Sequence, residues 1–91
     1  MLDIKILFSH TCPTCNMMLP LIEEIIADYS EKVCAEWIDA DAHPDVYETY
    51  KIEIVPTILF YKKGVEVARM AGMIGEEILR ERIEKSTCIS R

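Results

Sequence analysis

No apolar run in this sequence approaches the about 18–20 residues that a membrane-spanning helix needs. The N-terminus passes from Met1 straight into a strand-like pattern, without the basic region and cleavage site of a secretory leader. Basic residues are outnumbered, 10 Lys and Arg against 16 Asp and Glu, and the net charge is -6. These absences predict a cytoplasmic protein that binds no membrane and no nucleic acid, and whose partners are proteins.

Glycine, proline and cysteine are also scarce. With 3 Gly and 4 Pro, the sequence has no internal repeat, low-complexity tract or linker. Four Cys are too few for a disulfide-dense miniprotein, and a reducing cytoplasm disfavours a structural disulfide framework. The cysteines are therefore expected to serve redox chemistry, to bind a metal or to lie buried as thiols.

The residues that are present fit one folded domain. Apolar residues make up 51% of the 91-residue chain and charged residues 29%, a balance typical of a globular protein rather than a disordered one. We expect a single domain over residues 1–91, in which residues 86–91 form a loose tail.

Apolar spacing predicts alternating strands and helices, and Gly64 marks a hairpin turn. The strand–helix–strand beginning implies a right-handed crossover between two parallel strands, to which the hairpin adds antiparallel ones. The predicted fold is α/β, in the order βαβαββα, with a four-stranded mixed sheet flanked by helices. The expected elements are strands 3–9, 33–39, 57–61 and 65–70 and helices 14–29, 41–51 and 75–85.

Several sulfur-containing and apolar side chains are expected in the core. Free Cys is among the most buried residue types, so Cys34, in a predicted strand, is interpreted as a core residue. Cys88, in the expected tail, is interpreted as a surface thiol open to glutathionylation or to pairing with another chain. The other expected core residues discussed below are Met17, Met18, Trp37, Ile78, Leu79 and Ile83.

The motif Cys12-Pro13-Thr14-Cys15 lies where the first strand gives way to a helix. Pro13 suits the first helical position, which places Cys12 at the N-cap. There the free backbone N–H groups of Thr14 and Cys15 and the helix dipole stabilise a thiolate, the attacking form of Cys, so Cys12 is the predicted nucleophile. Cys15 lies about one turn further along and can attack a mixed disulfide at Cys12, which makes it the predicted resolving cysteine.

The alternative interpretation of this motif is half of a zinc site. Such a site needs a second pair of ligands, and Cys34 and Cys88 stand singly and far apart in the sequence. Redox chemistry is therefore the preferred hypothesis, and no metal is expected.

Three further features, together with the cysteine pair, resemble the thioredoxin superfamily over essentially the whole chain. Pro20, inside the first predicted helix, resembles the helix-kinking proline of thioredoxins. The segment Val55-Pro56-Thr57 resembles the stretch that carries the cis-proline of the family, and Gly72 resembles the glycine after its fourth strand. The resemblance implies a thioredoxin-like fold, a cis bond before Pro56 that faces the cysteines, and the reduction of protein disulfides.

The resemblance also implies how such a protein works. It needs no bound cofactor, because an external protein similar to thioredoxin reductase restores the dithiol, and its substrates are disulfide-containing proteins. A monomer is expected. Met73, in a loop expected beside the cysteines, is a candidate apolar docking contact. The expected substrate-binding residues are Pro13, Thr14, Val55, Pro56, Thr57, Gly72 and Met73.

The chain also departs from thioredoxins beneath the cysteines. Thioredoxins have a buried Asp before the first cysteine and a Lys on the next strand, and those places hold Ile6 and Trp37 here. The usual proton acceptor for Cys15 is therefore missing, and the sequence leaves open whether water, the leaving group or another base replaces it.

The dipeptide Pro13-Thr14 between the two cysteines instead resembles that of glutaredoxins. A glutathione-dependent glutaredoxin is therefore the alternative function. His10 and Glu76 are only weak counterparts of the residues with which glutaredoxins hold glutathione. A protonated His10 would also stabilise the Cys12 thiolate. A further alternative is a non-catalytic or metal-binding module of the same fold.

Overall fold

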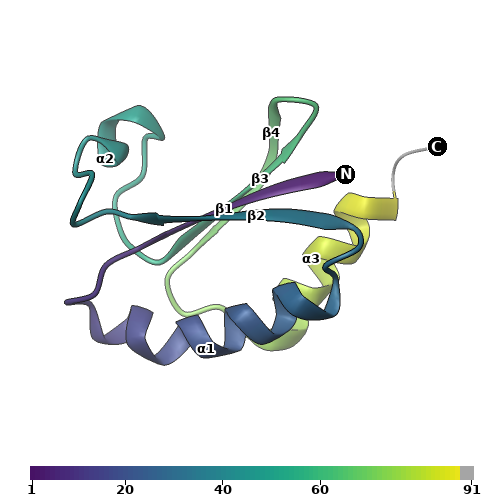
Figure 1. Ribbon diagram of the computed structural model, residues 1–91, viewed down its shortest axis with the longest axis horizontal. Coiled ribbons are helices and arrows are strands. Elements are labelled where there is room, and N and C mark those ends of the chain that lie inside the picture. Colours follow the sequence, from purple (N-terminus) through teal and green to yellow (C-terminus); the bar gives the residue numbers. More distant parts are fainter. Residues whose placement is uncertain (89–91) are drawn as a thin grey trace.

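The strands and helices of residues 1–88 follow the predicted order βαβαββα (Figure 1). The computed structural model describes these residues, with the backbone alone at Cys88. The elements are β1 (Leu2–Phe8), α1 (Pro13–Asp28), β2 (Val33–Asp39), α2 (Val46–Thr49), β3 (Thr57–Lys62), β4 (Val65–Ala71) and α3 (Glu76–Cys88).

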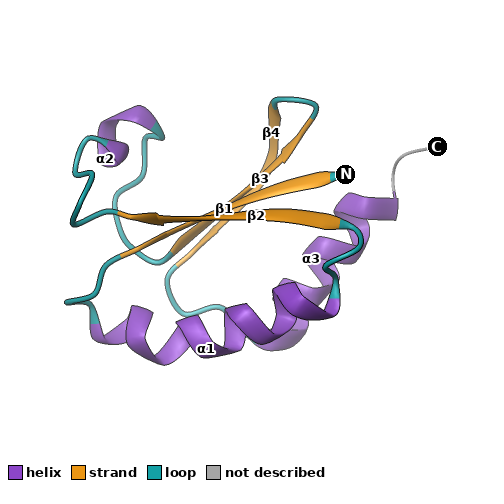
Figure 2. Cartoon of the chain, in the orientation of Figure 1, coloured by secondary structure: helices purple, strands orange, loops and turns teal. Residues whose placement is uncertain are grey.

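The strands form one mixed sheet in the order β2-β1-β3-β4 (Figure 2). β1 and β2 run in parallel, from Leu2 opposite Val33 to Phe8 opposite Asp39, while β3 is antiparallel to both β1 and β4. This is the predicted four-stranded arrangement. Because parallel partners end at the same edge of a sheet, the loops that follow Phe8 and Asp39 begin side by side.

Apolar side chains fill both faces of the sheet, as alternation along a central strand requires. On one face, Ile4 and Ile6 of β1 and Phe60 of β3 belong to a core cluster completed by α1 and α3, and each is at most 1% exposed. On the other face, Leu7 of β1 packs in a smaller cluster with Val46 of α2. Figure 1 shows α1 and α3 together on one side of the sheet and α2 on the other, which confirms the predicted flanking helices.

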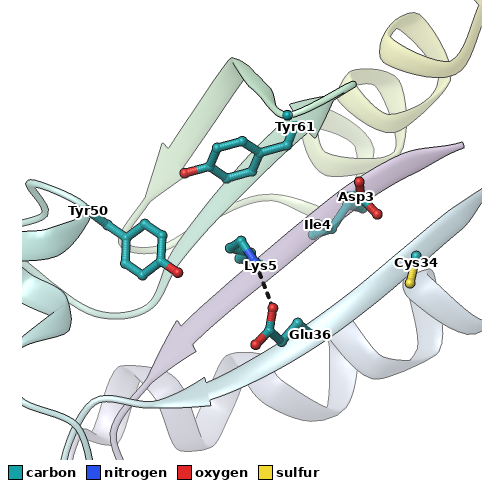
Figure 3. Close-up of a pocket in the computed structure, with 8 residues that line it drawn as sticks. Asp3, Ile4, Lys5, Cys34, Glu36, Tyr50 and Tyr61 are labelled. Atoms are coloured by element: carbon teal, nitrogen blue, oxygen red, sulfur yellow. Dashed lines mark hydrogen bonds and ion pairs between the residues drawn. The ribbon is translucent and has the colours of Figure 1, made fainter.

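Two residues of β2 that were expected in the core are exposed, so that prediction is wrong. Trp37 is 38% exposed, and Cys34 is an exposed free thiol. Cys34 lines a pocket of about 330 Å³ beside the ion pair of Lys5 and Glu36, whose Nζ and Oε1 atoms are 2.6 Å apart (Figure 3). β2 is an edge strand. Cys34 lies on the face of α2, a helix too short to cover it, whereas Trp37 lies opposite Ile6 on the face of α1 and α3 and is exposed at the edge of the sheet.

The two long helices each bury one stripe of side chains. Met18, Leu79 and Ile83 are at most 5% exposed, as predicted. Met17 and Ile78 were expected inward as well, but they are 67% and 58% exposed. A helix that packs on one side buries only part of its surface, and these two residues fall outside that stripe. None of the helices in the described residues is long and apolar enough to cross a membrane.

The helix lengths differ from the predictions in two places. α2 covers four residues rather than 41–51, because most of residues 40–45 lie in turns. α3 continues to Cys88, and Ser86 is buried, with its carbonyl accepting a hydrogen bond from Lys62 Nζ at 2.7 Å. The expected loose tail therefore does not begin at Ser86. The rest of that tail, residues 89–91, and the side chain of Cys88 lie outside the described residues.

Candidate active site

Cys12 and Cys15 lie at the start of α1. Pro13 occupies the first turn, where its missing N–H would have no helical partner, and Cys12 is the N-cap with extended angles (φ -92°, ψ 117°). The Cys12 N–H donates to the Ser9 carbonyl at 3.4 Å, which closes the loop between β1 and the helix. Both cysteines are free thiols in this structure.

The sulfur of Cys12 lies between the helix start and the loop before β3. Its thiol donates to the carbonyl oxygen of Val55 at 3.6 Å and makes no capping hydrogen bond to α1. The nearby backbone N–H of Cys15 and, to a smaller degree, that of Thr14 lower the pKa of Cys12, although burial opposes them. A thiolate has no proton to donate to the Val55 carbonyl, so ionisation removes this hydrogen bond.

The sulfur of Cys15 has the opposite character. Cys15 is 0% exposed, and its Sγ accepts a hydrogen bond from the backbone N–H of Ser9 at 3.5 Å. Burial raises the pKa of Cys15 to about 11, and the neighbouring Cys12 and Asp41 add to the increase. One helical turn thus holds a thiol whose pKa is lowered beside a thiol whose pKa is raised.

The loop that faces Cys12 has the cis bond that the resemblance implied, between Val55 and Pro56. The Thr57 hydroxyl donates to the Ile54 carbonyl at 2.6 Å, so its side chain is turned into the loop and is 2% exposed. The Gly72 N–H donates to the Pro56 carbonyl at 2.9 Å, and the φ of Gly72 is +78°, in the left-handed region that favours glycine. The structure thereby joins residues 54–57 to the end of β4.

The predicted substrate-binding residues differ in how far they are open to a partner. Pro13 and Met73 are exposed, the latter by 67%, and Val55 is half-buried with its carbonyl at Cys12. Ile54 is 52% exposed and lies beside Gly72, where a Cβ would meet its Cδ1 atom at 3.6 Å. Sequence reasoning did not single out Ile54, the apolar residue directly before the Val55-Pro56-Thr57 segment.

The two weaker candidates face other partners. The His10 Nε2 atom lies 3.2 Å from Asp39 Oδ2, and its ring packs edge-on against Phe8. Glu76 accepts a hydrogen bond from Arg80 Nε at 2.9 Å, within α3. Neither side chain has a recorded contact with Cys12. No group of three or more His, Cys, Asp or Glu side chains in the described part of the chain is arranged to hold a metal ion.

Sequence reasoning also missed a hydrogen-bonded pair beneath the motif, Ser9 and Asp41. The Ser9 hydroxyl donates to the Asp41 carboxylate, with both oxygens 2.9 Å away, and the His10 N–H donates to the same carboxylate at 3.1 Å. The signal was available, because Ser9 follows β1 directly and Asp41 lies two residues after β2. Two parallel strands bring the residues after their carboxyl ends together.

Comparison with known proteins places the chain in a family. A model of the thioredoxin family matches residues 5–85. The thioredoxin of Staphylococcus aureus is 32% identical over 74 residues, which are 81% of this chain and 71% of that protein. The crystal structure of the germline-specific thioredoxin Deadhead of Drosophila melanogaster superposes with a TM-score of 0.83 at 26% identity, covering 92% of this chain and 79% of that one. The chain belongs to the thioredoxin family.

Other relatives are longer proteins. The chloroplastic M-type thioredoxin of Spinacia oleracea is 31% identical over 74 residues, or 81% of this chain. The chain spans 41% of the length of that protein and 43% of its counterpart from Pisum sativum. The matches confirm the thioredoxin-like α/β fold that the sequence predicted.

Proposed function

We propose that this protein is a thiol-disulfide oxidoreductase that reduces disulfides in other proteins. The observation that carries the proposal is the opposite behaviour of two thiols within one helical turn. The pKa of Cys12 is lowered by the helix start, whereas burial raises the pKa of Cys15 to about 11. A partly exposed thiolate and a buried partner thiol are what an attacking and a resolving cysteine require.

In the first step, the Cys12 thiolate attacks one sulfur of a substrate disulfide. A new S–S bond joins Cys12 to that sulfur, the substrate S–S bond breaks, and the second substrate sulfur leaves as a thiolate. The helix dipole stabilises Cys12 as the nucleophile before the attack, because the positive end of α1 lies at the motif.

In the second step, Cys15 loses its proton and attacks the Cys12 sulfur. The Cys12–Cys15 disulfide forms, the mixed disulfide breaks, and the second substrate thiol is released, so two electrons have passed to the substrate. An external reductase returns two electrons and two protons to the pair. None of these steps requires a bound cofactor or metal.

The loop opposite the motif provides the substrate site in this proposal. The carbonyl of Val55 already faces Cys12 at 3.6 Å, and an extended substrate segment would bond to this backbone beside Pro56. Pro13, Thr14, Gly72 and Met73 border the same surface, and Thr57 contributes through its backbone because its hydroxyl is held by Ile54. Exposed Met73 and Ile54 offer apolar contact area.

The partners follow from the same chemistry. We expect an electron donor similar to thioredoxin reductase, disulfide-containing protein substrates, a monomeric protein and a cytoplasmic location. No observation favours the glutaredoxin alternative, because His10 contacts Asp39 and Glu76 contacts Arg80.

Two coupled assays test the proposal on one disulfide-bonded protein substrate. NADPH consumption is followed with thioredoxin reductase in one and with glutathione and glutathione reductase in the other. We expect turnover in the first assay, loss of turnover in Cys12→Ser, and unchanged turnover in the control Cys34→Ser. Turnover in the glutathione assay alone would support a glutaredoxin. Failure of the chemically reduced protein to reduce any protein disulfide would reject the proposal.

A further inference from the structure

The resolving cysteine lacks a carboxylate from β1. Ile6, which stands where thioredoxins have their buried Asp, is 0% exposed and packs in the core cluster beneath α1 and α3. The titratable groups that act on Cys15 come from elsewhere: Cys12 from the start of its own helix and Asp41 from the loop after β2. His10 and Asp39 form a further pair of titratable side chains at the rim of the same loops, with Nε2 and Oδ2 3.2 Å apart.

Ser9 connects Asp41 to the buried sulfur. Its backbone N–H donates to Cys15 Sγ at 3.5 Å, while its hydroxyl donates to the carboxylate of Asp41 at 2.9 Å. The same hydroxyl oxygen accepts the Thr11 N–H at 3.2 Å. Ser9 is 5% exposed, so one buried residue touches both the thiol and the carboxylate.

Asp41 is exposed, and within the described residues its side chain is hydrogen-bonded only to the loop that precedes the motif. Its carboxylate accepts hydrogen bonds from the Ser9 hydroxyl and the His10 N–H, and its own N–H donates to Asp39 Oδ1 at 2.9 Å. Because Asp41 is exposed, screening by water and salt makes the effect of its charge on a neighbouring sulfur modest.

We propose that Asp41 is a positioning residue for Cys15, acting through Ser9. The carboxylate holds Ser9 in the place from which its N–H reaches the sulfur, and its negative charge favours the protonated thiol over the thiolate. Asp41 therefore moves the pH at which the resolving attack becomes fast to a higher value, in addition to the larger effect of burial. This inference rests on the proposed function for its role in turnover, although the charge effect on Cys15 exists without it.

The effect falls on the second step of the reaction. Cys15 must give up its proton before its sulfur can displace the substrate from Cys12, and the proton passes to the departing substrate thiolate or to water. A nearby negative charge opposes that loss. Replacing Asp41 by Asn removes the charge and leaves an amide oxygen that can still accept the Ser9 and His10 hydrogen bonds.

The test begins with the ionisation of Cys15 itself. In a Cys12→Ser background, the 13Cβ chemical shift of Cys15 is titrated with pH by NMR, with and without Asp41→Asn. Asp45→Asn is the matched control, because Asp45 is an exposed carboxylate of the same segment with no recorded side-chain hydrogen bond. We expect Asp41→Asn to lower the midpoint by about 0.3–0.7 pH unit and the control to leave it unchanged. An equal shift in both variants, no shift, or an upward shift would overturn the inference.

A second measurement follows the resolving step. A chromophoric aromatic thiol is first coupled to Cys12 as a mixed disulfide, and its release by Cys15 is timed across a range of pH. Asp41→Asn should release it about two to five times faster near pH 7, with the pH profile moved to lower pH. A slower release would identify Asp41 as a proton acceptor and contradict the proposal. If the wild-type protein releases no thiol, the proposed function fails, whereas the titration still decides the inference.

Discussion

The thiol of Cys12 donates to the carbonyl oxygen of Val55, 43 residues away in the sequence, at a distance of 3.6 Å. The contact joins the start of α1 to the loop before β3, so a nucleophile and a backbone acceptor face the same opening. Pro56 follows Val55 and has no N–H, which leaves this part of the loop without a donor that would compete for the sulfur. The reactive surface is therefore built from two loops that the sheet brings together.

Cys12 is expected to react with alkylating agents at lower pH than an ordinary cysteine. The N–H groups at the start of α1 lower its pKa, so a larger fraction of it is thiolate at neutral pH than of an ordinary cysteine. Cys15, whose pKa is raised to about 11 and which is 0% exposed, should remain unmodified. Pulse alkylation with peptide mapping by mass spectrometry measures both, and a Cys34→Ser background removes the other exposed thiol described. A Cys12 midpoint at or above the ~8.5 of a free cysteine would contradict the prediction.

Gly72→Ala should lower the free energy of unfolding by about 1–2 kcal/mol, because Gly72 has a φ of +78° that an L side chain adopts poorly. Disulfide reduction should weaken with it, since the Gly72 N–H bonds to the carbonyl of Pro56. Gly75→Ala is the matched control: its backbone is outside the left-handed region, and a Cβ there meets Ile78 Cδ1 at 3.9 Å, an ordinary contact. Urea unfolding measures the free energy of unfolding of both variants. An equal decrease in the two would contradict the prediction, because it would show that a side chain at Gly72 causes no backbone strain.

Ile6→Asp places a carboxyl where thioredoxins have one, and it should destabilise this protein by at least about 3 kcal/mol. Ile6 is 0% exposed, and its β2 partner is Trp37 rather than a Lys. Burial raises the pKa of the new carboxyl in the folded state above the ~3.9 of the unfolded chain. The variant is therefore most stable below about pH 4, where the carboxyl is protonated in both states. Its free energy of unfolding falls as the pH rises through the pKa that the carboxyl has in the folded state.

Unfolding of Ile6→Asp in urea at several pH values measures this loss. Ile6→Val, which removes one buried methylene, is the control and should cost about 0.5–1.5 kcal/mol with no added pH dependence. A stable Ile6→Asp variant whose stability does not fall with rising pH would mean that the site already accommodates a carboxylate.

The element order and the sheet were predictable because local patterns dominate in the centre of this fold. β1 is buried on both faces of the sheet, so its sequence is an apolar run. α1 is buried along one stripe, so its apolar residues recur in i, i+4 rows. The strand–helix–strand order then leaves one common handedness for the crossover. Cys12 and Cys15 were found for the same reason, since their spacing and the following Pro13 are local features.

The errors lie at the edge of the sheet, where burial depends on what covers it. Cys34 and Trp37 have the residue types of a buried strand, but only tertiary structure tells whether a second layer packs against β2. The length of α2 was overestimated because the residues before Val46 form turns rather than a helix. Asp and Pro are typical both of turns and of helix starts, so Asp41 and Pro44 do not distinguish the two.

The link between Ser9 and Asp41 was missed because it spans 32 residues and no motif marks it. Predicting it requires the register of two parallel strands, which brings Phe8 opposite Asp39 and so places the following residues together. A serine hydroxyl beside a carboxylate is common on protein surfaces. It acquires meaning here only because the same serine donates its N–H to Cys15.

Trapping of mixed disulfides tests the central claim most directly. Cys15→Ser and Cys12→Ser variants, each also carrying Cys34→Ser, are incubated with an oxidised disulfide-containing protein, quenched with alkylating agent and analysed by non-reducing gel electrophoresis and mass spectrometry. The assigned roles predict that Cys15→Ser accumulates a covalent adduct through Cys12, because nothing resolves it, whereas Cys12→Ser forms little. Equal trapping by the two variants, or an adduct through Cys15, would contradict Cys12 as the nucleophile and Cys15 as the resolving thiol.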